Sequence, residues 1–122
     1  MKKVLLLALT LLAAASLFGS VTAAQASPIS RANAVRQAKN YLQTSGFSFK
    51  GLVSQLKYEG YSTSDATYGV SHSGANWYKQ AARKAKEYLR SMPFSRKGLV
   101  DQLKYEGFTP SQAAYGVRAA GL

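Results

Sequence analysis

Residues 34–70 have the sequence AVRQAKNYLQTSGFSFKGLVSQLKYEGYSTSDATYGV, and residues 81–117 have the sequence AARKAKEYLRSMPFSRKGLVDQLKYEGFTPSQAAYGV. Aligned without a gap, the two stretches are identical at 23 of 37 positions. A match of this extent does not arise by chance, so it indicates a tandem duplication, and the repeat unit decides the fold. Between the copies lies the segment SHSGAN at 71–76, whose serine, glycine and asparagine content is typical of a loop.

Each copy is predicted to form three short helices, because its apolar residues recur every three or four positions. In the first copy Ala34, Ala38 and Leu42 form one apolar stripe of the first helix. Ser48 is placed to cap the N-terminus of the second helix, and Gly60 is placed to end it in the left-handed conformation that glycine tolerates. The second copy carries the same signals 47 positions later.

The third helix of each copy follows directly. Ser62 with Asp65 three positions later resembles a capping box, and Pro110 stands at a first helical position. Gly69 and Gly116 recur inside this helix, which predicts that another helix approaches it closely. We therefore expect an all-α protein, a tandem duplication of a three-helix unit that contains a helix-turn-helix, with six short helices in all.

The N-terminal segment has the features of a secretory signal peptide. Lys2 and Lys3 precede an almost uninterrupted apolar run at 4–18, and AQA at 24–26 is a small-x-small cleavage site. The run is shorter than the roughly 18 to 20 residues that span a bilayer. We expect a signal peptide at 1–26, a first repeat at 27–70, a linker at 71–76, a second repeat at 77–122, and no transmembrane segment in the mature chain.

Composition narrows the classes of function. The chain carries 16 Lys plus Arg against 5 Asp plus Glu, a net charge of +11 that falls to +9 for the 96 residues after the signal peptide. It has no cysteine, which excludes disulfides, thiolate metal sites and thiol nucleophiles. It has one histidine, His72, so a catalytic Ser/His/Asp triad could be built at one place only. We expect a protein without catalytic residues, metal or cofactor.

The repeat also carries a recognisable pattern: A-x-x-x-A-K-x-Y-L, then F-S-x-K-G-L-V-x-Q-L-K-Y-E-G-[FY], then A-x-Y-G-V, twice over residues 34–117. This pattern resembles the Ltp-like family of host cell-surface-exposed lipoproteins with tandem helix-turn-helix repeats. The resemblance implies superinfection exclusion, in which a prophage-encoded protein at the bacterial surface blocks DNA injection by an incoming phage by engaging its tape measure protein. Members of this kind carry a lipidated cysteine, which this sequence lacks.

Basic residues form a regular pattern on the first helix of the second copy. They follow i, i+4, i+7, i+11 spacing, which places them on one cationic edge; these residues are Lys79, Arg83, Lys86 and Arg90. The first copy retains Arg36 and Lys39 there. Such an edge is either a solvated helix face or a site that attracts an anionic partner.

Three aromatic residues are harder to assign to a core: Trp77, Tyr58 and Tyr105. They either pack between helices or form a protein-binding surface with their polar tips in solvent. Glu59 and Glu106 recur at the C-terminal end of a helix, where the helix dipole disfavours an anion. We expect a hydrogen bond or ion pair from a neighbouring helix to compensate, with Arg36 or Arg83 as candidate partners.

A basic helix-turn-helix raises the question of DNA binding. Reading bases requires Arg, Lys, Asn or Gln on the third helix. The solvent-side candidates there are Ser64, Asp65 and Thr67 in one copy, and Ser111, Gln112 and Ala114 in the other. This set is poorly suited to base recognition, so we expect no sequence-specific DNA binding.

The sequence thus predicts a bacterial, non-enzymatic interaction module that is secreted or associated with the cell surface or cell wall. Its leading function is phage exclusion through a phage protein, by resemblance the tape measure protein. The alternative is a cationic envelope-associated protein that binds anionic cell-wall polymer or lipid headgroups. In either case we expect a monomer.

Overall fold

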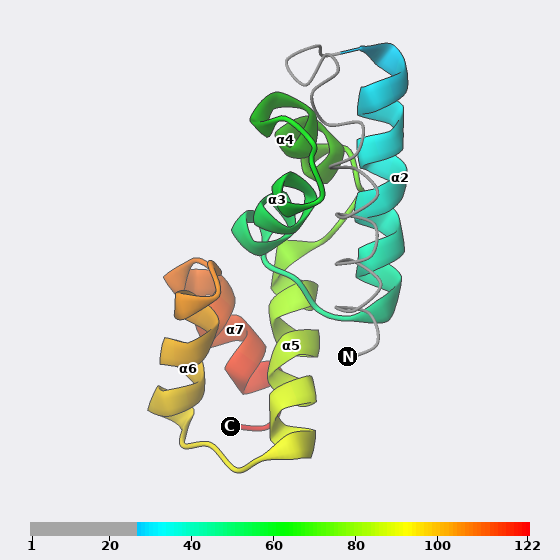
Figure 1. Cartoon of the computed structure of the whole chain (residues 1–122). Helices are drawn as coiled ribbons and strands as arrows, with labels where there is room; N and C mark the ends of the chain where they lie inside the picture. Colours follow the sequence, from blue (N-terminus) through cyan, green and yellow to red (C-terminus); the bar gives the residue numbers. More distant parts are fainter. Residues whose placement is uncertain (1–26) are drawn as a thin grey trace.

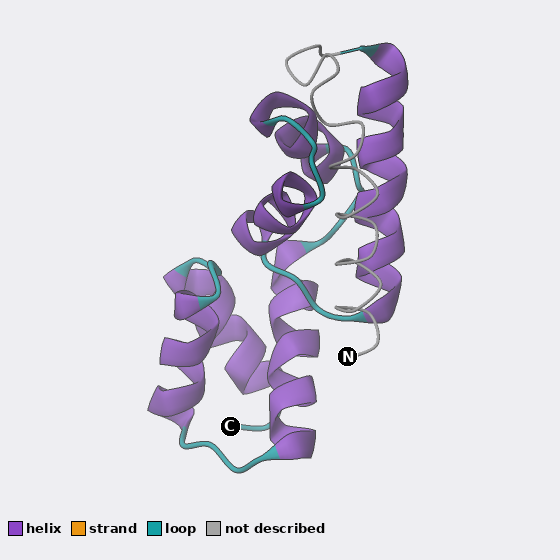
Figure 2. Cartoon of the chain, in the orientation of Figure 1, coloured by secondary structure: helices purple, strands orange, loops and turns teal. Residues whose placement is uncertain are grey.

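The computed structural model describes residues 27–122, and the predicted signal peptide lies outside the described residues. Across residues 27–122 the chain forms six helices and no strand (Figures 1 and 2). The first copy contains α2 (Pro28–Thr44), α3 (Phe49–Tyr58) and α4 (Thr63–Ser71). The second contains α5 (Trp77–Ser91), α6 (Arg96–Tyr105) and α7 (Pro110–Ala119). The predicted all-α fold is confirmed.

The helix ends lie where the sequence signals place them. Ser48 Oγ accepts a hydrogen bond from the Gly51 N–H at 2.9 Å, and Ser95 caps α6 in the same way. After α3 and α6, Gly60 and Gly107 adopt φ values of 102° and 105°. These conformations are accessible to glycine and strained for other residues, so both glycines end their helices as predicted.

The third helices start differently in the two copies. Thr109 and Gln112 form a complete capping box at the start of α7. Ser62 caps α4 by accepting from the Asp65 N–H at 3.0 Å, but the Asp65 carboxylate instead accepts from Ser30 Oγ at 2.5 Å. Asp65 is 1% exposed, so the expectation that it faces solvent is wrong. The start of α4 packs on the start of α2 and encloses this side chain.

Two separate apolar cores form, one within each copy. The first is built on Ala34, Ala38, Tyr41, Leu52, Leu56, Ala66 and Val70. The second is built on Ala81, Ala85, Leu99, Leu103, Phe108, Ala113 and Val117. In each copy the first and third helices make the most extensive contact.

The contact between the first and third helices depends on a glycine in both copies. A Cβ at Gly69 would lie 2.6 Å from the carbonyl carbon of Ala34, and a Cβ at Gly116 would lie 2.6 Å from that of Ala81. Real Cβ atoms do not approach backbone so closely. The predicted close helix approach is confirmed in both copies.

The helix α5 links the two units (Figure 1). Its first residue, Trp77, packs against the core of the first copy and meets Phe49 edge-on with 5.4 Å between ring centroids. The rest of α5 contacts α6 and α7. Among residues 27–122, no helix has the length and apolar character needed to cross a membrane.

Candidate interaction surfaces and the joint between the repeats

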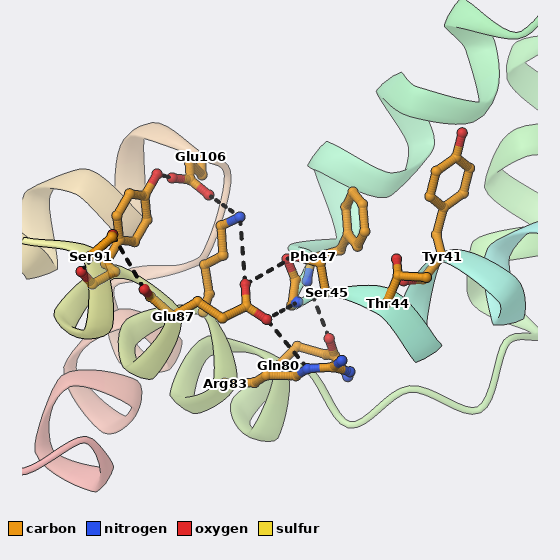
Figure 3. A network of polar contacts seen from close by, with 12 residues as sticks. Tyr41, Thr44, Ser45, Phe47, Gln80, Arg83, Glu87, Ser91 and Glu106 are labelled. Atoms are coloured by element: carbon orange, nitrogen blue, oxygen red, sulfur yellow. Dashed lines mark hydrogen bonds and ion pairs between the residues drawn. The ribbon is translucent and has the colours of Figure 1, made fainter. Parts of the chain in front are cut away.

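The loop between α2 and α3 lies against α5 and forms a joint between the two repeats. The Glu87 carboxylate accepts hydrogen bonds from Ser45 Oγ at 2.9 Å and from the Gly46 N–H at 3.0 Å (Figure 3). Gln80 Oε1 accepts from the Phe47 N–H at 3.1 Å. Gly46 is needed here, since a Cβ would lie 2.8 Å from the backbone nitrogen of Lys84. One loop of the first repeat is thus bound through its backbone to one helix of the second.

Arg83 strengthens the same joint. Its guanidinium donates to the Leu42 carbonyl at 2.5 Å and to the Gln43 carbonyl at 3.1 Å, and its Nε lies 3.4 Å from Glu87. The last carbonyls of a helix have no partner within the helix and carry partial negative charge, so a cation there is favourable. Arg83 therefore satisfies the C-terminal end of α2.

The two recurring glutamates are compensated by neighbouring helices, but not by the arginines we expected. Glu59 accepts from Gln37 Nε2 at 2.9 Å, and Glu106 accepts from the Tyr88 hydroxyl and lies 3.9 Å from Lys84 Nζ. Gln37 and Lys84 follow Arg36 and Arg83 by one position, and one position turns a helix by about 100°. Arg36 consequently points to solvent, and Arg83 points to the joint.

Burial raises the pKa of both glutamates above the usual value of 4.5. The hydrogen bond from Gln37 opposes this rise in the pKa of Glu59. For Glu106, the positive charge of Lys84 lowers the pKa and the negative charge of Glu87 raises it, both by less than burial does. These are carboxylates held in packed positions by hydrogen bonds.

The four predicted cations of α5 line one open pocket between α5 and α7, with a volume of about 410 Å³. We call it the cationic pocket; its lining residues are Lys79, Ala82, Arg83, Lys86, Arg90, Tyr115 and Ala119. The side chains of Lys79, Lys86 and Arg90 are exposed and form no hydrogen bond or ion pair with any residue from 27 to 122. Arg36 and Lys39 are also exposed, on α2, outside this pocket.

The aromatic candidates separate into two groups. Trp77 packs against the first core, which agrees with the interpretation that it lies between helices. Tyr58 is 49% exposed at the end of α3, and Tyr105 is 88% exposed at the end of α6. Sequence reasoning missed a further exposed pair, Tyr78 and Tyr115, whose rings meet edge-on with 5.5 Å between centroids.

The same two positions are also in contact in the first copy. Tyr78 aligns with Arg31, and Tyr115 aligns with Tyr68. In the first copy Arg31 lies over the Tyr68 ring, 5.0 Å from its centroid. An aromatic ring has replaced the cation at the same contact in the second copy.

The comparisons with known proteins agree with this architecture. The family model described as host cell surface-exposed lipoprotein matches residues 30–72 and again residues 76–119. The chain belongs to this Ltp lipoprotein family. No curated protein sequence matches the chain.

A solved structure of the Ltp type is similar over most of the chain. It is Ltp, a superinfection exclusion protein from the Streptococcus thermophilus temperate phage TP-J34. The identity is 36%, the TM-score is 0.71, and the alignment covers 80% of this chain and 99% of that chain. The tandem of two three-helix units is therefore shared with that Ltp protein.

Proposed function

We propose that this chain is a superinfection exclusion protein, an exported and non-enzymatic interaction module that acts at the bacterial cell surface. The observation that carries the proposal is the similarity to the phage TP-J34 exclusion protein, which extends over both repeats at 36% identity. The description of its family as surface-exposed supports the location. In this role the protein blocks the entry of phage DNA after the phage has adsorbed.

The partner in this proposal is a phage protein, and the tape measure protein is the candidate that the family resemblance supplies. A specific protein interface needs large side chains that become buried on binding. Tyr58 and Tyr105 occupy equivalent positions in the two copies and are exposed in both. They are the best anchors that residues 27–122 offer, whereas Trp77 serves the core of the first repeat.

The test is expression of the chain in a susceptible bacterial host, with phage adsorption and phage DNA entry measured separately. We expect normal adsorption and blocked entry for at least one phage. A Tyr58→Ser/Tyr105→Ser variant should restore entry, because loss of an anchoring aromatic side chain costs about 2 kcal/mol or more of binding free energy. Ile29→Ser/Met92→Ser serves as the matched control, since it also removes two exposed large apolar side chains and neither residue lines the cationic pocket.

Two results would contradict the proposal in different ways. Normal DNA entry by every phage tested, with folded protein present at the surface, would reject exclusion itself. Equal loss of exclusion in the two double variants would reject Tyr58 and Tyr105 as the anchors and leave exclusion standing.

A further inference from the structure

The cationic pocket is a second candidate surface, and its chemistry differs from that of a protein interface. Lys79 and Arg90 are eleven positions apart on α5, which corresponds to about 16 Å along a helix axis. Lys86 lies between them on the same edge. The pocket is therefore an open site of considerable length, with positive charge along one side.

The positive charge of this pocket is not neutralised by the second repeat. None of the pocket-lining residues is acidic. Glu87 is bound at the joint, Asp101 pairs with Lys97 at 2.7 Å, and Glu106 lies beside Lys84. Since the nearby carboxylates are engaged elsewhere, three ammonium and guanidinium groups remain available to an anion.

The floor of the pocket favours a charged polymer over a protein. Apart from the cations it consists of the methyl groups of Ala82 and Ala119 and the half-exposed ring of Tyr115. Two methyl groups provide little apolar surface for the buried anchors that protein partners need. Lysine binds phosphate as a point charge, and arginine binds it with two parallel hydrogen bonds.

We propose that the cationic pocket binds a phosphodiester-linked polyol polymer of the bacterial cell wall, of the teichoic acid type. Lys79, Lys86 and Arg90 contact successive phosphates, and the Tyr115 hydroxyl donates to phosphate or polyol oxygen. Arg83 lines the same pocket but holds the end of α2, so it contributes charge and not a direct contact. Binding of this kind would hold the chain at the cell wall, and it does not depend on phage exclusion.

The experiment measures binding of the purified exported protein to fluorescently labelled poly(glycerol phosphate) at 50 and 200 mM salt. Three neutralised phosphates on a flexible polyanion give a log–log salt slope of about −2, so the affinity should fall about 20-fold over this range. Lys79→Gln/Lys86→Gln/Arg90→Gln should weaken binding at least about tenfold at 50 mM salt and lose most of the salt dependence.

The matched control is Lys39→Gln/Lys57→Gln/Lys104→Gln, which removes the same charge from exposed positions outside the pocket. Its affinity should stay within about threefold of the wild type, since charges that do not contact the polymer act on it only through salt-screened attraction. If both triple variants weaken binding equally, net charge alone is responsible and the proposed site is wrong. If the pocket variant fails to fold, Lys86→Gln against Lys57→Gln makes the same comparison with one charge.

Three further probes separate the chemistry and its source. Equal or tighter binding to poly-glutamate of the same charge, to phosphatidylglycerol vesicles or to double-stranded DNA would overturn the proposal in favour of an acidic protein, a membrane or nucleic acid. Retention on isolated cell walls should be lost after the phosphodiester polymer is extracted. Unchanged retention on extracted walls would overturn the proposal as well.

Discussion

At the scale of single residues, the two glycines at the helix crossings decide how closely α2 packs on α4 and α5 packs on α7. Each stands against an alanine backbone at a distance that leaves no room for a methyl group. Glycine in a helix costs about 1 kcal/mol relative to alanine, so its presence at both crossings is explained by packing.

Gly116→Ala should therefore destabilise the protein although alanine is the better helix former. We expect a loss of about 1 to 3 kcal/mol in the free energy of unfolding, the usual cost of overpacking. Gly98→Ala is the control, because its Cβ would meet only the side chains of Ser95 and Phe94. Urea denaturation measures both; an unchanged midpoint for Gly116→Ala would show that the crossing can widen at no cost.

The raised pKa values of Glu59 and Glu106 make a second prediction at this scale. A carboxyl group whose folded pKa lies above its unfolded value of 4.5 binds more protons in the native state. Its contribution to the free energy of unfolding is then greatest below 4.5 and declines as pH rises through the folded pKa.

The Glu59→Gln/Glu106→Gln variant should lack this decline. Denaturation below pH 4.5 and at neutral pH, compared between wild type and variant, isolates the effect from the rest of the charge. Asp101→Asn is the control, since the pKa of Asp101 is lowered by Lys97 and its contribution has the opposite sign. A parallel pH profile in wild type and double variant would contradict the assignment.

At the scale of elements, the joint is the feature with the greatest consequence for shape. It consists of hydrogen bonds from one loop and one helix end to α5, and it has no apolar core of its own. Ser48 Oγ adds a hydrogen bond to the Glu106 carbonyl at 2.5 Å. The relative orientation of the repeats therefore depends on a few polar groups and on the packing of Trp77.

Glu87→Ala removes the carboxylate that accepts hydrogen bonds from the Ser45 hydroxyl and the Gly46 N–H. Leaving the Gly46 N–H and the Ser45 hydroxyl without that partner should cost about 1 to 3 kcal/mol. It should also broaden the range of angles between repeats, which residual dipolar couplings measure. Asn40→Ala, at the equivalent position of α2, should cost less than about 0.5 kcal/mol. Unaltered couplings in Glu87→Ala would show that Trp77 alone fixes the orientation.

The helices could be predicted from the sequence because their start and stop signals are local. The contacts between the two repeats could not, because they join residues far apart in the sequence. The serine caps at 48 and 95 and the glycines at 60 and 107 act within four residues, so their roles follow from the sequence. The joint connects Ser45 to Glu87 across 42 positions, and the sequence around either residue contains no pattern that predicts this contact. The cationic edge was visible as helical spacing, but the engagement of Arg83 by α2 depends on how the repeats dock.

At the scale of the whole molecule, two separate cores imply two regions of separate stability. Leu103→Ala, in the second core, should cost about 2 to 5 kcal/mol. Amide hydrogen exchange should then lose protection in α5 to α7 and retain it in α2 to α4. Leu56→Ala, the equivalent change in the first core, should give the reverse pattern. Loss of protection throughout the chain in both variants would show that the repeats fold as one unit.

The proposed export makes a simple prediction about the mature chain. If residues 24–26 form the signal peptidase site, the exported protein should begin at Ser27, as N-terminal sequencing of the extracellular and wall fractions would show. Recovery of membrane-bound chain that begins at Met1 would identify the apolar segment as an anchor instead.

The joint also bears on whether molecules of this protein can stack head to tail. The loop that docks in the first repeat contains Ser45-Gly46, whereas the second repeat has Met92-Pro93 there, and Asn40 stands where the acceptor Glu87 would be needed. Proline has no N–H to donate, and a side chain at 93 would meet the helix that glycine allows to approach. A second molecule that repeated the internal contact at either end would therefore lack these hydrogen bonds and would bring Pro93 against α2. The differences at positions 40, 92 and 93 thus oppose open-ended fibres, the hazard of any head-to-tail contact.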